Sequence, residues 1–135
     1  MSYQCIAEGA NGLIYYHFTQ MRMSDGRFAE HWAYICETVR EIARHLDVFL
    51  SDPGPAAEET DVTKFSVRTW RKDGSVWVLA TNNTREPLTA ETGLSEHVGQ
   101  VAEVAFGTAP EVRGRRLKFD LKPLGCALVR FKGEK

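Results

Sequence analysis

The chain has 135 residues, of which 43% are hydrophobic and 26% are charged, and its formal net charge is -1. This composition is that of a globular protein and excludes a disordered chain, while the length suits one ordinary domain core. A net charge near zero lacks the basic surplus of nucleic-acid binders, so no nucleic-acid partner is expected. The one basic cluster, within residues 113–118, is interpreted as a solvated strand edge, where charges discourage edge-to-edge pairing.

Three cysteines, Cys5, Cys36 and Cys126, lie far apart among apolar neighbours. An odd number with wide spacing favours reduced thiols over a disulfide framework or a zinc site. The four histidines show no metal-ligand spacing with one another or with cysteine, so no metal or cofactor is expected. No signal peptide and no apolar run of membrane-spanning length is visible, which leaves the cytoplasm as the default location and predicts no membrane partner.

The N-terminal part of the chain predicts a strand followed by a long helix. Residues 3–8 predict the end of a helix that Gly9 terminates. Residues 12–18 form a continuous apolar run of the kind buried on both faces of a parallel sheet. A loop follows, and Ser24 or Asp25 is the predicted N-cap of the long helix.

The long helix has one apolar face that needs a large partner. Its apolar residues recur at three- and four-residue steps, which places them on one stripe. They are Phe28, Trp32, Ile35, Cys36, Val39, Ile42, Ala43, Leu46, Phe49 and Leu50. On the opposite face, Glu37 with Arg40 and Glu41 with Arg44 are spaced for ion pairs.

The pattern changes at residues 51–61, where two prolines, a glycine and a Glu-Glu pair predict a linker. Beyond it, short runs with alternating polarity, separated by turn residues, predict antiparallel strands. These runs are 62–70, 75–81, 87–94, 100–106, 115–121 and 125–131. The predicted fold class is therefore α+β: a β/α unit with a long amphipathic helix over residues 1–50, then an antiparallel β-sandwich over residues 62–135.

Several segments together carry a family resemblance. They are residues 7–18, the helix segments 32–35, 39–42 and 46–50, and the strand segments 77–82 and 121–129. In this order they resemble the final β/α unit of a TIM-barrel glycoside hydrolase, followed by the all-β C-terminal domain that many of these enzymes carry. The resemblance is one of layout, spans nearly the whole chain and contains no strict signature.

The resemblance implies that the catalytic residues lie outside this chain. Glycosidases need two carboxylates placed across the scissile bond, and in barrels of this type these acids usually lie on strands earlier than the last. Glu8 precedes the predicted strand and Glu30 follows it, so neither sits at the carboxyl end of the strand, where barrel chemistry takes place. No catalytic residue is predicted, and the chain alone is not expected to be active.

Four residues are candidates for carbohydrate contacts. Tyr16, His17 and Phe18 match the place where related enzymes put an aromatic platform under the sugar, although the Trp often found there is missing. His17 has the alternative interpretation of a hydrogen-bonded histidine at the barrel end. Trp70, beside the Asp-Gly turn, is expected to be half exposed and able to stack on a sugar, whereas Trp77 is expected in the sandwich core.

The sequence therefore predicts a C-terminal fragment of a glycoside hydrolase, with a non-catalytic sandwich that contributes stability and carbohydrate contacts. A stand-alone carbohydrate-binding module or a structural interaction module is the alternative. A single β/α unit cannot cover its own apolar surfaces, so either a missing barrel portion, a second copy or the chain's own sandwich must do so. Self-association through residues 12–50 is favoured over a folded-back helix in which Trp32 contacts the sandwich.

Overall fold

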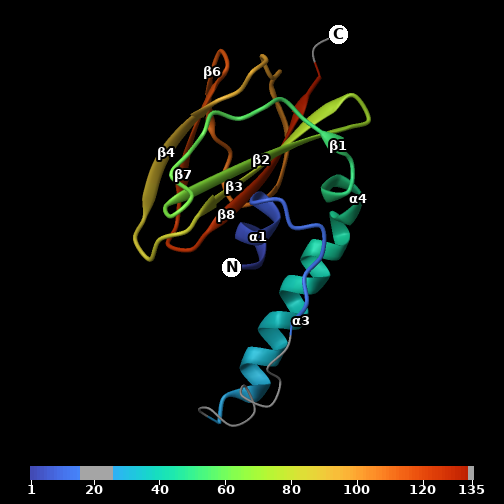
Figure 1. Cartoon of the computed structure of the whole chain (residues 1–135), viewed down its shortest axis with the longest axis vertical. Helices are drawn as coiled ribbons and strands as arrows, with labels where there is room; N and C mark the ends of the chain where they lie inside the picture. The colour runs from blue at the N-terminus through green and yellow to red at the C-terminus, as the bar shows by residue number, and fades with distance from the viewer. Residues whose placement is uncertain (16–25, 134–135) are drawn as a thin grey trace.

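The computed structural model describes residues 1–15 and 26–133, which form an α+β protein (Figure 1). One sheet has five strands in the order β1-β2-β3-β8-β5, and a second has three in the order β4-β7-β6. All pairings in both sheets are antiparallel. The α+β class with an antiparallel, sandwich-like β part is confirmed.

The helices and strands have the following bounds. The helices are α1 (Ser2–Ala7), α3 (Phe28–Arg44) and α4 (Leu46–Phe49). The strands are β1 (Asp52–Pro53), β2 (Phe65–Lys72), β3 (Ser75–Asn82), β4 (Leu88–Gly93), β5 (Val101–Phe106), β6 (Glu111–Arg113), β7 (Arg116–Leu121) and β8 (Cys126–Lys132). Each of the six predicted strand runs corresponds to an observed strand, and only β1 and β6 were not predicted.

The hairpin between β2 and β3 has the predicted turn. Asp73 and Gly74 both adopt positive φ angles, 49° and 70°. Two successive positive φ angles match the right-handed twist of the flanking strands, and Asp-Gly adopts them at little steric cost. The turn sets the register in which Lys72 lies opposite Ser75 and Trp70 lies opposite Trp77.

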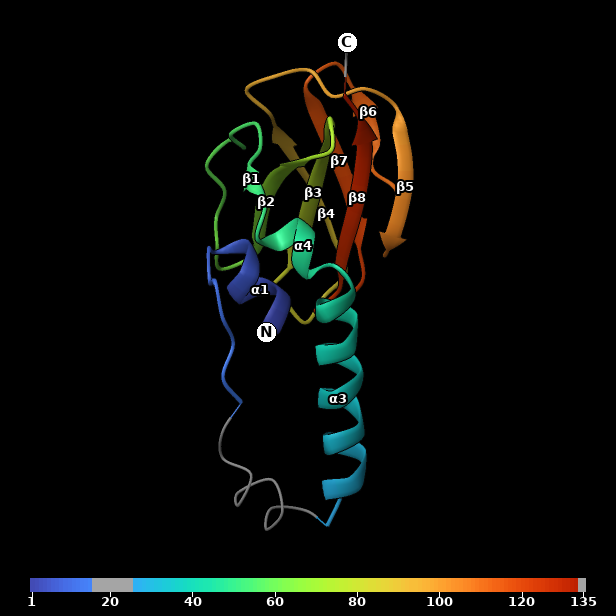
Figure 2. The ribbon, with the colours of Figure 1, turned by 90° about the vertical axis from the view of Figure 1, so that its right-hand side faces the viewer.

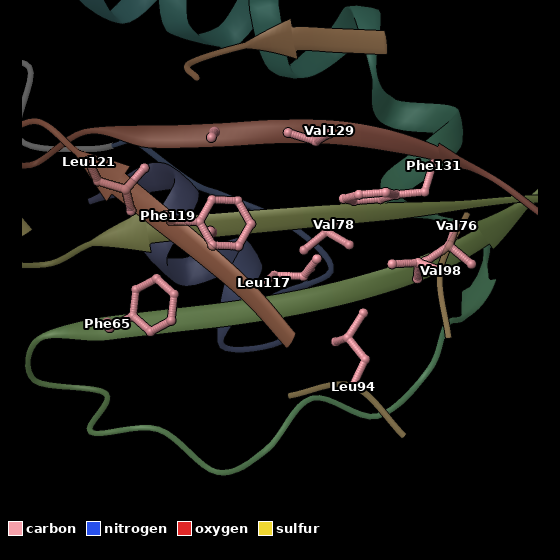
Figure 3. Packing of buried hydrophobic residues seen from close by; sticks show 12 residues of the cluster. Phe65, Val76, Val78, Leu94, Val98, Leu117, Phe119, Leu121, Val129 and Phe131 are labelled. Atoms are coloured by element: carbon pink, nitrogen blue, oxygen red, sulfur yellow. The ribbon is translucent and has the colours of Figure 1, made fainter. Parts of the chain in front are cut away.

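The main hydrophobic core lies between the two sheets (Figure 3). Phe119 and Leu117 of the three-stranded sheet point toward Val78, Val129 and the neighbouring side chains of the five-stranded sheet. These side chains alternate along each strand with residues on the opposite face, as strand geometry requires. The sandwich therefore has a complete core of its own.

A second apolar cluster covers the outer face of the five-stranded sheet and corrects the predicted positions of both tryptophans. Trp77 is buried, as predicted, but it lies on the outer face beneath the helices and not in the core between the sheets. Trp70 lies beside it and is only 3% exposed, so the expectation that it is half exposed was wrong. The cluster contains Ile6, Ala7, Val48, Trp70, Trp77, Leu79 and Leu128.

Residues 51–61, predicted as a linker, pack along the sandwich. Asp52 and Pro53 form the edge strand β1 against β2, where the missing N–H of a proline is tolerated. Pro55 is buried, and its carbonyl accepts a hydrogen bond of 2.6 Å from the Thr69 hydroxyl. Ala57 then bridges to Leu94, next to β4. The segment thus runs from one sheet to the other and belongs structurally to the sandwich.

The predicted long helix is interrupted at His45. Its backbone leaves the helical region there, with φ -115° and ψ 15°, and separates α3 from α4. The His45 ring lies among aromatic rings, with its centroid 6.2 Å from that of Trp77 and 5.9 Å from that of Phe106. The predicted N-caps, Ser24 and Asp25, lie outside the described residues.

Helix α4 is held against the sheet, whereas α3 extends away from it (Figures 1 and 2). The Phe49 ring contacts Trp70 with centroids 5.3 Å apart, and the Asp47 carboxylate accepts a hydrogen bond from the Lys72 ammonium. That hydrogen bond lowers the pKa of Asp47. No residue of α3 is fully buried, and Trp32 is 44% exposed. The folded-back arrangement in which α3 covers the sandwich is therefore not observed.

The N-terminal segment has the predicted short helix but no strand within its described part. Helix α1 is followed by Gly9, whose φ of 103° is the left-handed conformation expected after a helix end. Residues 12–15 are extended but belong to no sheet. Residues 16–18, the rest of the predicted strand, lie outside the described residues. A strand forms only when another chain segment pairs with its backbone, and no described segment lies where it could pair.

Candidate functional site

The structure removes Trp70 from the set of accessible carbohydrate-binding candidates. Its ring is enclosed by Phe49 of α4, by its cross-strand partner Trp77, and by the Arg68 guanidinium, whose central carbon is 5.9 Å from the ring centroid. A buried ring cannot stack on a sugar. The remaining candidates, Tyr16, His17 and Phe18, lie outside the described residues.

An open cleft does lie between helix α3 and one end of the sandwich. Its volume is about 470 Å³, within the usual range for small-molecule sites. Tyr15 contributes from the extended segment, Tyr34 and Glu37 from α3, and Tyr3 from α1. On the sandwich side the cleft is bounded by the end of β3 and by residues 124–126 at the start of β8. Segments far apart in the sequence thus meet at one place.

A hydrogen bond between Tyr3 and Glu41 forms the inner end of this cleft. The Tyr3 hydroxyl donates to Oε1 of Glu41 and so ties α1 to α3. Burial, and then this hydrogen bond to a carboxylate, raises the pKa of Tyr3 far above its usual value. Burial, reinforced by the Glu41 charge, raises the pKa of the Cys126 thiol to about 12. Both groups are therefore neutral at physiological pH, and the thiol is not a nucleophile there.

The open part of the cleft combines exposed aromatic rings with carboxylates. Tyr34 is 71% exposed, and Tyr15, whose hydroxyl lies 2.7 Å from the Ser2 hydroxyl oxygen, is also exposed. Glu37 and Glu41 stand one helical turn apart on the same flank of α3. The described residues that line the cleft include no lysine, arginine or histidine, and their one cationic group is the α-ammonium of Met1, against two carboxylates. The cleft therefore offers hydrogen-bond acceptors and negative charge.

Sequence reasoning missed this cleft, although part of the signal was present. Tyr34, Glu37 and Glu41 are spaced by three and four residues, which places them on one flank of a helix. The glutamates were instead predicted to pair with Arg40 and Arg44. Within the described part of the chain neither pair forms, and Glu41 binds Tyr3. The contribution of Tyr3, 38 residues earlier, depends on tertiary packing and has no local sequence signal.

A second, apolar groove lies on the other side of α3. It is lined by Leu13 of the extended segment and by Val39, Ile42 and Leu46 of the helical stripe, and its volume is about 230 Å³. Val39 and Leu46 remain exposed although they belong to the predicted apolar face. The sequence-predicted stripe is therefore present but is not covered by the described residues.

The basic cluster is solvated, as the sequence predicts, but Arg116 and Lys118 lie on β7, the middle strand of the three-stranded sheet, and not on the predicted strand edge. Arg116 lies 3.5 Å from carboxylate oxygens of both Glu58 and Glu91. Lys118 lies 3.6 Å from a carboxylate oxygen of Glu111. All of these side chains are substantially exposed, so the ion pairs contribute little to stability. Their charges are largely balanced on the surface of the three-stranded sheet and form no basic patch.

The described ranges give no evidence for a disulfide, a metal site or a membrane-spanning helix. The three cysteines are unpaired and half-buried. Residues 1–15 and 26–133 contain no group of three or more histidine, cysteine or acidic side chains placed to hold a metal ion. In the same ranges, no helix has the length and apolar character needed to cross a membrane.

No protein-family model, curated protein or solved structure matches the chain. Inferences about its function therefore depend on the geometry of its own residues.

Proposed function

We propose that this chain is the C-terminal part of a TIM-barrel glycoside hydrolase, consisting of its final β/α unit and an accessory β-sandwich. One observation carries the proposal. Residues 10–15 and helix α3 form an extended segment and a helix that lie side by side, both with apolar surface that the described residues leave uncovered (Figure 2).

The extended segment has the properties of a strand that lacks its neighbours. Leu13 faces the groove beside α3, whereas Ile14, the next residue, is 86% exposed. Successive side chains of a strand point to opposite faces, so both faces of this segment are apolar. Among the described residues, no backbone hydrogen bond joins residues 11–15 to any other segment. Such a segment suits a parallel sheet, in which strands are paired on both sides and covered on both faces.

The direction of the chain also fits a β/α unit. From α1 the extended segment runs away from the sandwich, and α3 returns alongside it (Figure 2). In a TIM barrel each strand is followed by a helix that returns antiparallel to it and packs on the outside of the barrel. The stripe of α3 faces the groove beside the extended segment, as this packing requires.

The same geometry supports an accessory role for the sandwich. Barrel chemistry takes place at the carboxyl ends of the strands. The first turn of α3, which follows the proposed strand in the sequence, lies far from the sandwich (Figure 2). The helix has 17 residues and therefore spans about 25 Å. The sandwich would hold the last helix in place through α4 and would not contribute a catalytic acid.

The alternative is a stand-alone carbohydrate-binding module, and the cleft between α3 and the sandwich is the observation that favours it. The two proposals differ in what they require of the α3 stripe. A module needs no further β/α units, whereas a barrel fragment needs them to cover Ile14 and Trp32.

The purified chain should hydrolyse no glycoside. A retaining or inverting mechanism needs two carboxylates on opposite sides of the scissile bond. Glu37 and Glu41 lie on one flank of one helix, so they do not provide that arrangement. The measurement is release of nitrophenol from a panel of aryl glycosides at several pH values. Turnover that copurifies with the chain and disappears in the Glu37→Gln variant would contradict this prediction.

The proposal itself is tested by the DNA immediately upstream of the codon for Met1. An open reading frame that continues upstream and encodes further alternating strands and helices, with two acidic residues at strand ends, is the expected result. An in-frame stop codon close to Met1, with a ribosome-binding site between them, would refute the barrel fragment and leave the binding module.

A further inference from the structure

We infer that the cleft between α3 and the sandwich binds a neutral or amino saccharide through Tyr15, Tyr34, Glu37 and Glu41. The location depends only on the geometry of the cleft. The choice of a sugar among polyhydroxylated ligands rests on the proposed function.

The aromatic rings supply a surface suited to one face of a sugar ring. Tyr34 projects from α3 and is 71% exposed, and Tyr15 lines the same cleft from the extended segment. A tyrosine combines an apolar ring with a polar hydroxyl, so it can contact an apolar face and a hydroxyl rim at once. Pyranose rings have this combination, because their C–H groups form apolar faces and their hydroxyls lie around the edge.

The carboxylates supply acceptors for the hydroxyls. An ionised carboxylate only accepts hydrogen bonds, and its two oxygens offer about four lone-pair sites. In Glu41 the Tyr3 hydroxyl uses one site on Oε1, which leaves Oε2 without a partner in the described structure. Glu37 makes no ion pair among the described residues. Sugar hydroxyls are donors and would fill these sites, and hydrogen bonds to a charged group are stronger than neutral ones.

The charge of the cleft determines which sugars it accepts. The two carboxylates outnumber the one cationic group among the described lining residues, the α-ammonium of Met1, so the net charge is negative. It disfavours uronic acids and phosphorylated sugars, because placing like charges together costs binding energy. A neutral sugar has no such cost, and an amino sugar gains an attractive charge interaction.

Apart from Tyr15, which lines both, the cleft is distinct from the surface that the barrel proposal uses. Val39, Ile42 and Leu46 line the apolar groove, whereas Tyr34, Glu37 and Glu41 lie on another flank of α3. Covering the apolar stripe would therefore leave these three side chains accessible. Ligand binding at Tyr34, Glu37 and Glu41 and the barrel proposal can therefore be tested separately.

Calorimetric titration of the whole chain tests the inference. The probes are three neutral trisaccharides (cellotriose, maltotriose and mannotriose), the trimer of glucosamine, and trigalacturonate. Saturable binding of the glucosamine trimer or of a neutral trisaccharide is expected, without measurable binding of trigalacturonate. Absence of binding by all four non-acidic probes, or equal binding of trigalacturonate, would overturn the inference. Comparison of the affinity for the glucosamine trimer with the affinities for the neutral trisaccharides separates recognition of the sugar ring from recognition of an ammonium group.

Variants at exposed positions locate the site. Tyr34→Ala should weaken binding at least about tenfold. Glu37→Gln should reduce the discrimination against trigalacturonate, because it removes charge and retains a hydrogen-bonding group. Trp32→Ala is the matched control, since it removes an exposed aromatic ring from another face of the same helix and should leave affinity unchanged. Wild-type affinity in Tyr34→Ala, with the helical circular dichroism signal retained, would also overturn the inference.

Discussion

Replacing either Trp70 or Trp77 with alanine should destabilise the chain by about 3–5 kcal/mol, the usual range for truncating a buried tryptophan. Both rings are buried in the cluster beneath α1 and α4, and they are cross-strand neighbours. Truncation of either would leave a cavity that the surrounding strands cannot fill by relaxation. Unfolding in urea, followed by far-ultraviolet circular dichroism, measures the loss.

Trp32→Ala is the matched control for this comparison. Trp32 is 44% exposed in α3, so its truncation should cost less than about 1 kcal/mol when measured at low protein concentration. The double variant of Trp70 and Trp77 should be non-additive, because the two rings share one cluster. A small loss at Trp70 with a large one at Trp77 would show that Trp70 is accessible after all.

The wild-type chain should self-associate in the absence of any partner, and Val39→Glu should make it monomeric. Trp32, Val39 and Leu46 form an exposed apolar stripe on α3, and Ile14 is exposed on the adjacent segment. Apolar patches beyond a few hundred Å² are rare on soluble monomers. Glutamate at position 39 places a charge within the stripe, and its helix propensity is at least that of valine. Sedimentation velocity over a range of concentrations measures the effect.

Arg40→Glu provides the control for the introduced charge. Arg40 is exposed next to Val39 but lies outside the stripe, so self-association should persist in this variant. A wild-type chain that stays strictly monomeric at high micromolar concentration would refute association through α3. The apolar stripe would then remain exposed to solvent without a covering partner, and a missing barrel would not be needed to cover it.

Much of the secondary structure could be predicted because its signals are local. Asp73-Gly74 accepts the positive φ angles of its turn without any tertiary contact, and Gly9 ends α1 for the same reason. Alternating polarity located six strands within a few residues of their observed bounds. The three- and four-residue spacing of α3 likewise predicted its apolar face.

Predictions that depended on which distant segment a residue contacts were less successful. Alternation places Trp77 and Leu79 on one face of β3, but it does not say whether a sheet or a helix covers that face. Residues 51–61 have the composition of a linker, yet Asp52 and Pro53 pair with β2 because an edge strand tolerates proline. The carbohydrate candidate Trp70 failed for the same reason, since α4 covers it.

The sequence by itself determined the positions of the six predicted strands, the tight turn after β2 and the amphipathic character of α3, because each depends on neighbouring residues along the chain. Only the tertiary structure decided which face of the five-stranded sheet is covered by helices, and that α3 extends beyond the sandwich. It also decided that Tyr3 and Glu41 meet across 38 positions to form the inner end of a cleft. These features depend on long-range packing. The free energy gained by burying apolar surface comes from contacts between segments that are distant in the sequence, and no local sequence pattern shows which segments will meet.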